Sequence, residues 1–460
     1  MKTPIALSRT LSKIPEMLHK TRSLSKIVIQ RILKKAELKK GLSLKDAGYL
    51  INAEPRNLVA NLFYAAAKIK QEIYGERLVF FAPLYISDYC VNDCEYCNFH
   101  GRNKAFGRHR LSLNEIEEQT KFLINQGHKR VLLELGENPI RNNMSYLTKA
   151  IRKIYSTQTP KGNIRRVNVN IAATTVENYR KLKKANIGTY QLFQETYHRP
   201  TYERIHQGPK ANYDRQITAH MRAFEGGLDD VGLGVLFGLY DWRYEVLALI
   251  AHAQYLDKVY GVGPHTISVP RFCPGTTVKY QPEHPVSDND FLKLIAILRL
   301  AVPYTGMIIS TRESPQIRKK AFKIGISQAS AGSVTTTGGY GKVKTQPQFN
   351  IHDERNLQEV INDVVKDNLI PSFCTACYRI GRTGKRFMGL AKPGDIHQFC
   401  RPNAIMTFAE YLADFTKGPA RKQGQKLINK YLAQIENKKI KLETEKRLGM
   451  IKKGTRDTYF

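Results

Sequence analysis

Three cysteines stand close together in the stretch "YISDYCVNDCEYCNFHGRN", residues 85–103. Cys90, Cys94 and Cys97 follow the spacing C-x3-C-x2-C, with no fourth cysteine nearby. A four-iron cubane held by three thiolates keeps one iron open to an external ligand, and an open iron can do more than pass electrons. The alternative is a zinc site, which needs four ligands and would take His100 as the fourth.

A second group of three cysteines lies near the other end of the chain. Cys374, Cys377 and Cys400 have the spacing C-x2-C-x22-C, and His397 could complete a zinc site with them. The number of cysteines is seven and no secretory signal precedes them, so metal or redox use is expected rather than a disulfide framework. Cys273 is left over and is expected to be an inert buried thiol.

The composition sets the size and class of the protein. The 460 residues are 42% hydrophobic, which predicts two or three domains with substantial cores. Lys and Arg number 73 against 40 Asp and Glu, a net charge of +33 that favours anionic partners. No arginine-rich array or zinc-finger spacing supports nucleic acid, so the charge is interpreted as a solvated basic surface. No membrane association is expected, because no run of 18 apolar residues occurs.

From about residue 79 the chain alternates short apolar or β-rich runs with segments of helix length. The runs are 79–87, 130–137, 167–173, 189–196, 231–238, 265–271, 307–313 and 326–332, and the helical segments include 112–126, 143–156, 175–186, 211–226, 241–257 and 287–302. Eight such repeats in about 250 residues predict an α/β fold, a closed (β/α)8 barrel. An open doubly wound sheet is the alternative.

Polar residues end most of these runs. They are Ser87, Glu137, Asn168, Asn170, Gln194, Glu195, Arg271, Ser310, Arg312 and Gln328. In a barrel we expect them to gather on the face formed by the carboxyl ends of the strands, where an active site would lie.

Helical segments flank the predicted barrel. We expect a helical N-terminal region over 1–75, the barrel over 76–335, and a mostly helical C-terminal domain over 336–460. This domain carries the second cysteine group and ends in a basic, solvated tail that frays at its end. Residues 1–12 are basic and lack acids, which fits either a short organellar presequence or a frayed terminus.

The C-x3-C-x2-C spacing after the first strand resembles that of the radical S-adenosylmethionine superfamily. The resemblance implies that S-adenosylmethionine binds the open iron of a 4Fe-4S cluster on Cys90, Cys94 and Cys97. Tyr96, before the last cysteine, also matches, and Gly136–Glu137 looks like the motif that seats the amino group of this cofactor. Gln194 and Glu195, which end the fourth run, are further candidates for cofactor binding.

Longer stretches resemble the tyrosine lyases that mature iron–iron hydrogenase, the HydG maturase family. Examples are "FAPLYISDYCVNDCEYC", "GTYQLFQETYHRPTYERIH", "GVGPHTISVPR" and "SFCTACYRIGRTGKRFMGLAKPG", and the resemblance extends from about residue 40 to about 405. It implies that the Cα–Cβ bond of L-tyrosine is cleaved to p-cresol and dehydroglycine. Dehydroglycine then yields carbon monoxide and cyanide, which leave as an Fe(CO)(CN)-cysteine unit for assembly of the hydrogenase H-cluster.

The same resemblance implies a second, auxiliary 4Fe-4S cluster on Cys374, Cys377 and Cys400. This cluster would carry an extra iron ligated by His265 and by L-cysteine, and a neutral imidazole suits ferrous iron. From the residues alone, a histidine at a strand start is more often structural. The implied partners are a reductant such as ferredoxin or flavodoxin, a second radical maturase, a scaffold GTPase and the apo-hydrogenase.

A tyrosine substrate needs a cation for its carboxylate. Arg271 and Arg312 end the sixth and seventh runs, where a bidentate guanidinium could bind it, and Arg312, with Ser310 beside it, is the preferred candidate. Either arginine could instead pair with a carboxylate of the barrel.

Two rival functions remain open. The thiamine-pathway 2-iminoacetate synthase shares the barrel and the first triad but generally lacks the second. A zinc-bearing nucleic-acid-binding protein would explain the positive charge directly. The family resemblance implies the cytoplasm of an anaerobe, or a hydrogenosome, mitochondrion-like organelle or plastid if residues 1–12 are a presequence.

Overall fold

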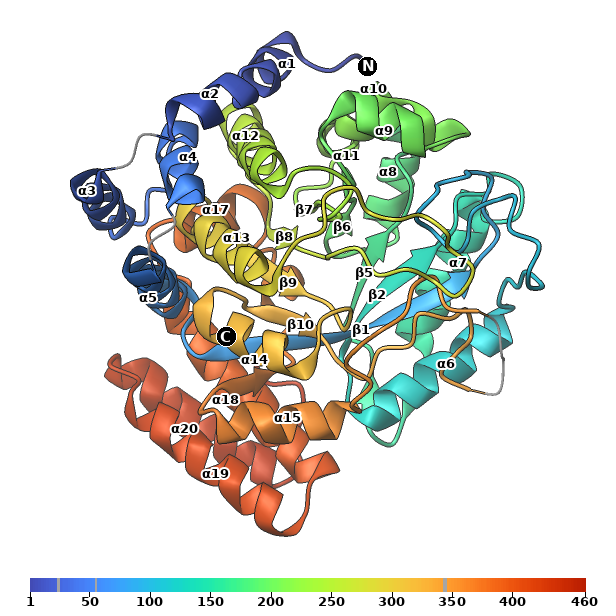
Figure 1. The fold of residues 1–460 in the computed structure, drawn as a ribbon. Helices are drawn as coiled ribbons and strands as arrows, with labels where there is room; N and C mark the ends of the chain where they lie inside the picture. The colour runs from blue at the N-terminus through green and yellow to red at the C-terminus, as the bar shows by residue number, and fades with distance from the viewer. Residues whose placement is uncertain (23–24, 54–55, 342–345) are drawn as a thin grey trace.

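The computed structural model describes residues 1–22, 25–53, 56–341 and 346–460. Within them, eight parallel strands close into a ring, because the last strand pairs again with the first (Figure 1). Around the ring the strands are β1 (Arg77–Ser87), β2 (Arg130–Leu135), β5 (Arg166–Asn170), β6 (Tyr190–Gln191), β7 (Val231–Gly234), β8 (Thr266–Ser268), β9 (Gly306–Ile309) and β10 (Gln328–Ser330). The predicted (β/α)8 barrel is confirmed, and the open sheet is excluded.

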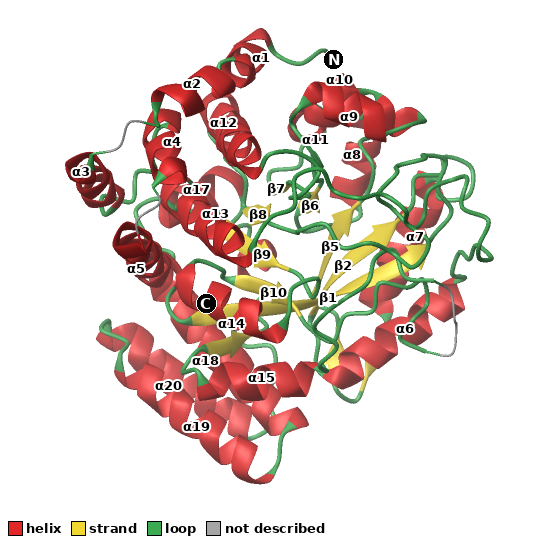
Figure 2. Ribbon diagram, in the orientation of Figure 1, coloured by secondary structure: helices red, strands yellow, loops and turns green. Residues whose placement is uncertain are grey.

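Helices connect the strands and surround the barrel (Figure 2). They are α6 (Leu113–Gln126), α7 (Met144–Ser156), α8 (Val176–Lys184), α9 (Arg199–Ile205), α10 (Tyr213–Ile217), α11 (Ala219–Glu225), α12 (Trp242–Tyr260), α13 (Asp288–Ala301) and α14 (Pro315–Ile324), with the short 3-10 turn η1 (Pro209–Ala211) and the hairpin β3 (Gln158–Thr159) and β4 (Gly162–Asn163). The single helix predicted over 211–226 is instead two, because Thr218 leaves helical geometry (φ −94°, ψ 6°).

Local signals in the sequence set the ends of these helices. Ser112 accepts a hydrogen bond from the backbone N–H of Glu115, whose side chain accepts one from the Ser112 N–H, and this capping box starts α6. Gly127 ends the same helix with φ 105°, a left-handed conformation that glycine adopts without steric cost. Such caps fix where each strand–helix unit returns to the barrel.

The N-terminal region packs on the side of the barrel. It forms α1 (Ile5–Ser12), α2 (Ile14–Lys20), α3 (Lys26–Ala36), α4 (Leu44–Asn52) and α5 (Arg56–Tyr74). Leu7 and Leu11 of α1 are buried, and α1 contacts α12. The expectation of a frayed terminus is therefore wrong, because these leucines give the first helix an apolar face to bury. The presequence hypothesis stays a prediction.

The C-terminal region is mostly helical, as predicted. It contains α15 (Leu357–Lys366), β11 (Ile370–Ser372), α16 (Ala376–Arg379), α17 (Gly384–Ala391), α18 (His397–Phe415), α19 (Gly418–Ala433) and α20 (Lys438–Lys452). β11 adds to the first residues of β1 in parallel, outside the ring. The end of the chain is not frayed, because the Phe460 N–H donates to Asn403 Oδ1 at 2.8 Å. The three domain boundaries stay a prediction.

No helix in the described ranges is both long enough and apolar enough to cross a bilayer.

Candidate functional site

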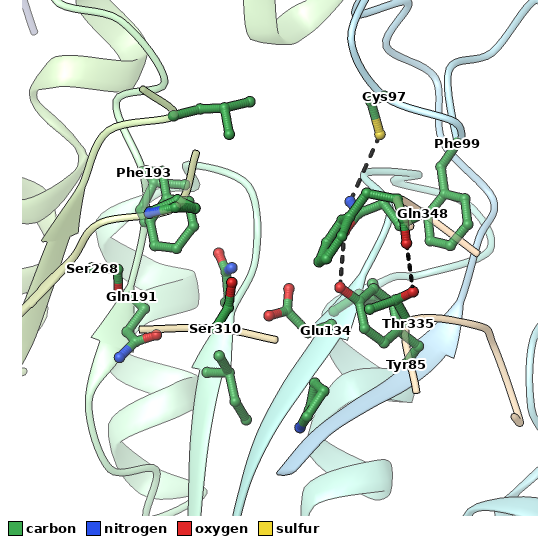
Figure 3. A pocket seen from close by; sticks show the side chains of 18 of the residues that line it. Tyr85, Cys97, Phe99, Glu134, Gln191, Phe193, Ser268, Ser310, Thr335 and Gln348 are labelled. Carbon is green, nitrogen blue, oxygen red and sulfur yellow. Dashed lines mark hydrogen bonds between the residues drawn. The ribbon is translucent and has the colours of Figure 1, made fainter. Parts of the chain in front are cut away.

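A large cavity opens where the strands of the barrel end. Its volume is about 1440 Å³ including its mouth, and side chains from every part of the ring line it (Figure 3). The sequence-predicted residues that it brings together are Cys90, Cys94, Cys97, Tyr96, Gly136, Glu137, Asn170, Glu195, Ser310 and Arg312. Gln194 and Arg271 do not line it. The expectation of a polar site at the carboxyl ends of the strands holds for this set.

The first cysteine triad lies in the loop directly after β1. Burial, together with the neighbouring Cys90, raises the pKa of Cys97 to about 11. Gln348 donates to the Cys97 sulfur at 3.7 Å and accepts a hydrogen bond from Tyr85 at 2.9 Å, which fixes one thiol against the cavity wall (Figure 3). Asn92 makes a similar 3.8 Å contact to the Cys90 sulfur. Gln348 and Asn92 carry no motif by which sequence reasoning could have found them.

Neither triad has its thiols converging on a single point. Among the described residues, no group of three or more His, Cys, Asp and Glu side chains is placed to hold one metal ion. In a cubane each iron takes its own cysteine, so three thiols that face a common space need not converge. His100, the zinc-type rival, lies with Nδ1 at 2.7 Å from Asp93 Oδ1.

Gly136 and Glu137 bring the end of β2 against the cysteine loop. A Cβ atom on Gly136 would lie 2.5 Å from the backbone oxygen of Tyr89 and 3.0 Å from Cys90 Cβ, so only glycine lets the two segments meet. Glu137 accepts hydrogen bonds from Arg215 and, at 2.6 Å, from Asn92. The carboxylate is thereby held beside the triad at the wall of the cavity.

Glu195 and Lys210 form an ion pair of 2.7 Å at the cavity, and the backbone N–H of Lys210 donates to Asn92 at 2.7 Å. Lys210 also lies close enough to Cys94 for its charge to lower the pKa of that thiol, against a larger increase from burial. Tyr96 donates to or accepts from His206 Nε2 at 2.8 Å, which orients its ring at the cavity edge. Lys210, in the 3-10 turn η1, could not be predicted from the sequence, because a lone lysine has no distinguishing pattern.

The two candidate arginines differ sharply in their surroundings. Arg271 pairs with Asp288 at 2.8 Å and with the buried Glu313, so its guanidinium is already neutralised. Arg312 lies against the Phe349 ring, with 3.3 Å from its guanidinium carbon to the ring centroid, and faces the cavity. No described carboxylate forms an ion pair with Arg312. Its charge is therefore available to a ligand.

Gln328 and the side chain of Asn168 face the opposite end of the barrel, so the expectation that all ten polar residues share one face is wrong for these two. Gln328 is the first residue of β10. Asn168 is in the middle of β5, and its Oδ1 accepts from the Thr189 N–H at 3.1 Å, just before β6 begins. Gln328 Oε1 accepts from Arg130, the first residue of β2, at 3.2 Å. A second polar layer thus closes the barrel at the amino ends of its strands.

The second cysteine triad lies beneath this layer. Cys374 follows β11, Cys377 is on α16 and Cys400 is on α18, and the backbone oxygen of Cys374 accepts from Arg130 at 2.7 Å. Burial raises the pKa of Cys377 to about 12, with further contributions from Cys400 and Cys374, so the three thiols lie near one another. His397 Nε2 lies beside Gly75.

His265 reaches the same place from the barrel. It directly precedes β8, and its ring stacks on Phe387 with centroids 4.0 Å apart and lies 5.7 Å from the ring of Tyr378, the neighbour of Cys377. Nδ1 is 2.8 Å from Asp230 Oδ2, which leaves Nε2 for another partner. His265 precedes Cys374 by 109 positions in the sequence, and the fold brings it to the second triad.

Polar side chains occupy the barrel between the two triads. Barrels of this type usually fill their interior with layers of branched apolar residues. Here Glu134, Asn170, Gln191, Ser268, Ser310 and Ser330 line the cavity together with the apolar Phe81, Leu132 and Ile308. β1 alone spans about 33 Å from one end to the other at 3.3 Å per residue. The two triads therefore lie at opposite ends of one barrel whose interior is partly polar.

Comparisons with known proteins agree with this arrangement. The family model described as the radical SAM superfamily matches residues 84–251, and the Biotin and Thiamin Synthesis associated domain matches 266–370. A crystal structure of HydG, a maturase of the [FeFe]-hydrogenase, is 50% identical with a TM-score of 0.95, covering 98% of this chain and 99% of that one. The HydG structure from Carboxydothermus hydrogenoformans is 39% identical with a TM-score of 0.84, covering 96% and 99%.

A more distant relative is the 2-iminoacetate synthase of Escherichia coli, 28% identical over 75% of this chain and 90% of its own length. The full-length match to HydG includes the second triad and the helices around it, which lie beyond the two family models. The chain therefore belongs to the radical SAM superfamily and, within it, to the HydG family of iron–iron hydrogenase maturases.

Proposed function

We propose that this maturase is a tyrosine lyase. The reaction cleaves L-tyrosine at Cα–Cβ to p-cresol and dehydroglycine, and dehydroglycine yields the carbon monoxide and cyanide of an Fe(CO)(CN)-cysteine unit. The observation that carries the proposal is the presence of a cysteine triad at each end of one barrel. Among the described residues, Arg312 at the first triad has no ion-pair partner, and His265 at the second uses only Nδ1 in its contact with Asp230.

The residues at the first triad fit a cubane and S-adenosylmethionine. Gly136 leaves the space that a Cβ would fill beside Cys90, and Asn92, Gln348 and Lys210 place donors or a cation beside the thiols. When bound, these groups supply one electron and a 5′-deoxyadenosyl radical. Glu137 would accept from the cofactor's ammonium group, and Lys210 would balance its carboxylate. Tyr96, Gln194 and Glu195 stay candidates for the same site.

Arg312 would bind the carboxylate of tyrosine. Its charge faces the cavity and has no ion-pair partner among the described residues. Burial lowers the pKa of Arg312, because a buried cation without a counter-charge is unfavourable. A bound carboxylate would supply that counter-charge. Ser310 lines the cavity beside it and would donate a further hydrogen bond. Arg271 would instead support Glu313 in the wall behind.

His265 would ligate the extra iron at the second cubane. A metal-bound histidine usually donates its other N–H to a carboxylate, which fixes the ring and raises its basicity. Asp230 provides that carboxylate at 2.8 Å from Nδ1. L-Cysteine would complete the iron's ligands.

The remaining assignments follow from the family. The partners would be a ferredoxin- or flavodoxin-type reductant, a second radical maturase, a scaffold GTPase and the apo-hydrogenase, in an anaerobe's cytoplasm or a hydrogen-producing organelle. Neither a nucleic acid nor a membrane is proposed as a partner.

The decisive experiment separates the two triads. The double variant Cys374→Ser/Cys377→Ser should still form p-cresol from tyrosine, because its first triad is intact, but should release no carbon monoxide. Carbon monoxide from this variant would contradict the role of the second triad. A wild-type chain that makes p-cresol but no carbon monoxide would be a 2-iminoacetate synthase, the alternative that the 28% identical relative represents.

Metal analysis after anaerobic preparation is the companion measurement. Two cubanes give about eight irons per chain, with a matching amount of sulfide. One or two zincs and no iron would point to the zinc-bearing alternative.

A further inference from the structure

Glu134 is a carboxylate in the middle of the cavity that the proposed function does not yet use. It belongs to β2, where it pairs in register with Tyr85 of β1 and Asn170 of β5, so the three side chains share one layer of the barrel. Its side chain points into the open centre of the cavity, level with Ser310 (Figure 3).

The other two carboxylates of the cavity are already neutralised. Glu137 is bound by Arg215, and Glu195 pairs with Lys210 at 2.7 Å. Glu134 has a neutral amide, Asn170, as its hydrogen-bond partner and forms no ion pair with any residue that the structure describes. Of the three, Glu134 alone is a carboxyl group without an ion-pair partner among the described residues.

The positions of Arg312 and Glu134 suit a zwitterion. An amino acid carries a carboxylate and an ammonium group on one carbon, and each needs an opposite charge when it leaves water. Arg312 lies three residues after β9 and faces the cavity. Its positive charge acts to lower the pKa of Glu134. With the carboxylate on Arg312, the ammonium group would meet Glu134.

We propose that Glu134 binds the ammonium group of the substrate and accepts its proton, so that the amino acid enters the reaction as a neutral amine. This inference rests on the proposed function. The step is balanced, because one N–H bond breaks, one carboxyl O–H bond forms, and an ion pair becomes an amine beside a carboxylic acid. The resemblance to the tyrosine lyases implies that the radical takes a hydrogen atom from the amino group of tyrosine. Its removal from an ammonium group would leave a buried cationic radical, whereas a neutral amine leaves a neutral radical.

The acidity of Glu134 supports this role. Burial raises its pKa to about 8, while Asn170 and Arg312 act in the opposite direction and Glu195 adds to the increase. Tyr85 also faces it. A base of this pKa accepts a proton from an ammonium group far more readily than an ordinary carboxylate does.

The kinetic test is the pH profile of p-cresol formation by Glu134→Gln. The wild-type rate should rise with pH as Glu134 ionises. The glutamine variant should lose about 100-fold in rate, and its remaining activity should rise only at higher pH, where free tyrosine already carries a neutral amine. Glu134→Asp should recover part of the rate, because it keeps the base.

The matched control is Glu245→Gln. Glu245 is also buried with a pKa raised by burial, to about 7, but it lies outside the cavity and accepts from Thr196 and the Tyr197 N–H. This variant should keep the wild-type pH profile. A Glu134→Gln profile that matches the wild type in rate and shape would overturn the inference.

Ligand binding gives a readout that does not depend on turnover. The wild-type chain, loaded with its clusters, should bind tyrosine about tenfold more tightly than 3-(4-hydroxyphenyl)propanoate, which lacks the amino group. Glu134→Gln should lose this preference and keep its affinity for the propanoate; an unchanged preference would contradict the role of Glu134. No p-cresol from the wild type would overturn the proposed function together with this inference, whereas equal p-cresol from wild type and Glu134→Gln would overturn the inference alone.

Discussion

The two ends of the barrel hold their cysteines in different ways. At the carboxyl end, three thiols lie in one loop of eight residues, and the charges around them are mostly paired, as in Glu137–Arg215 and Glu195–Lys210. At the amino end, the thiols come from three separate segments, which are the loop after β11, α16 and α18.

The charge around the second triad is also different. Arg77 and Arg130 act on these thiols, and the guanidinium groups of Arg130 and Arg166 lie over the Tyr378 ring. None of these three arginines forms an ion pair with any residue in the described ranges. One end is thus a balanced pocket suited to a neutral or zwitterionic ligand, and the other concentrates positive charge around its thiols.

The largest expected effect comes from breaking the first triad. Cys97→Ser should abolish p-cresol and carbon monoxide together, because the second end acts on what the first end makes. Gas chromatography and p-cresol assays on the same sample check this. Carbon monoxide without p-cresol would show that the two ends work independently.

Iron content supplies the control for this variant. Cys97→Ser should lose about four of eight irons per chain. Loss of all iron would mean that the substitution unfolded the chain rather than emptied one site.

The next effect separates the two arginines. Arg312→Gln should lower kcat/KM for tyrosine about 100-fold, or 2–3 kcal/mol, because it removes the buried partner of the substrate carboxylate. Its free energy of unfolding should change little, because Arg312 has no ion pair to lose among the described residues.

Arg271→Gln should show the reverse pattern. It leaves Glu313, whose side chain is 2% exposed, without its cation, and breaking a buried pair costs about 3–5 kcal/mol. Urea unfolding should detect this loss, while kcat/KM of the folded enzyme stays within about threefold. If Arg271→Gln abolished tyrosine binding in folded protein, the assignment of Arg312 would be wrong.

A smaller effect is expected at the second end. His265→Gln should reduce the iron content by about one per chain and lower carbon monoxide, while p-cresol stays near the wild-type level. Asp230→Asn should weaken the binding of that extra iron by about 10–100-fold, because the carboxylate orients the imidazole. Equilibrium iron titration distinguishes the two variants, and full retention of iron by His265→Gln would remove His265 from the ligand set.

The sequence predicted the local parts of this comparison well. The barrel follows from eight apolar runs, and the first triad follows from spacing within one loop, since both depend on neighbours in the chain. Asn168 and Gln328 were misplaced because the polar residue of a short strand can face either end, and only the register with β1 and β2 decides which.

What the sequence could not give are contacts between distant segments. Gln348 reaches Cys97 across 251 positions, and Lys210 reaches Glu195 from a different loop. Glu134 stands in the apolar-looking run "RVLLELGE", which shows neither that its side chain faces the cavity nor that it lacks an ion pair. Whether Glu134 has an ion-pair partner depends on which side chains the other seven strands place in the same layer of the barrel.

The smallest effect concerns a brace at the first end, formed by Asp214 with Thr3 and Arg199. Asp214 of α10 accepts from the Thr3 N–H at 3.1 Å and from Arg199 at 2.7 Å, and the next residue, Arg215, holds Glu137 at the cavity. Burial acts to raise the pKa of Asp214, but Thr3 and Arg199 outweigh it and hold the pKa below its ordinary value. A carboxylate whose pKa is lowered by folding stabilises the folded protein at pH values above its pKa in the unfolded chain, which is about 3.9 for Asp. This stabilisation is lost as the pH falls through the pKa of the folded protein.

Asp214→Asn should therefore lower the free energy of unfolding by about 1 kcal/mol, since the carboxylate is partly exposed and screened by solvent. The difference from wild type in urea unfolding should stay constant between about pH 6 and 8 and shrink only below about pH 4. Because the brace ends at Arg215, the same variant should weaken S-adenosylmethionine binding slightly and leave iron at the second triad unchanged. An equal loss at both ends would mean that Asp214 stabilises the barrel as a whole rather than its first site.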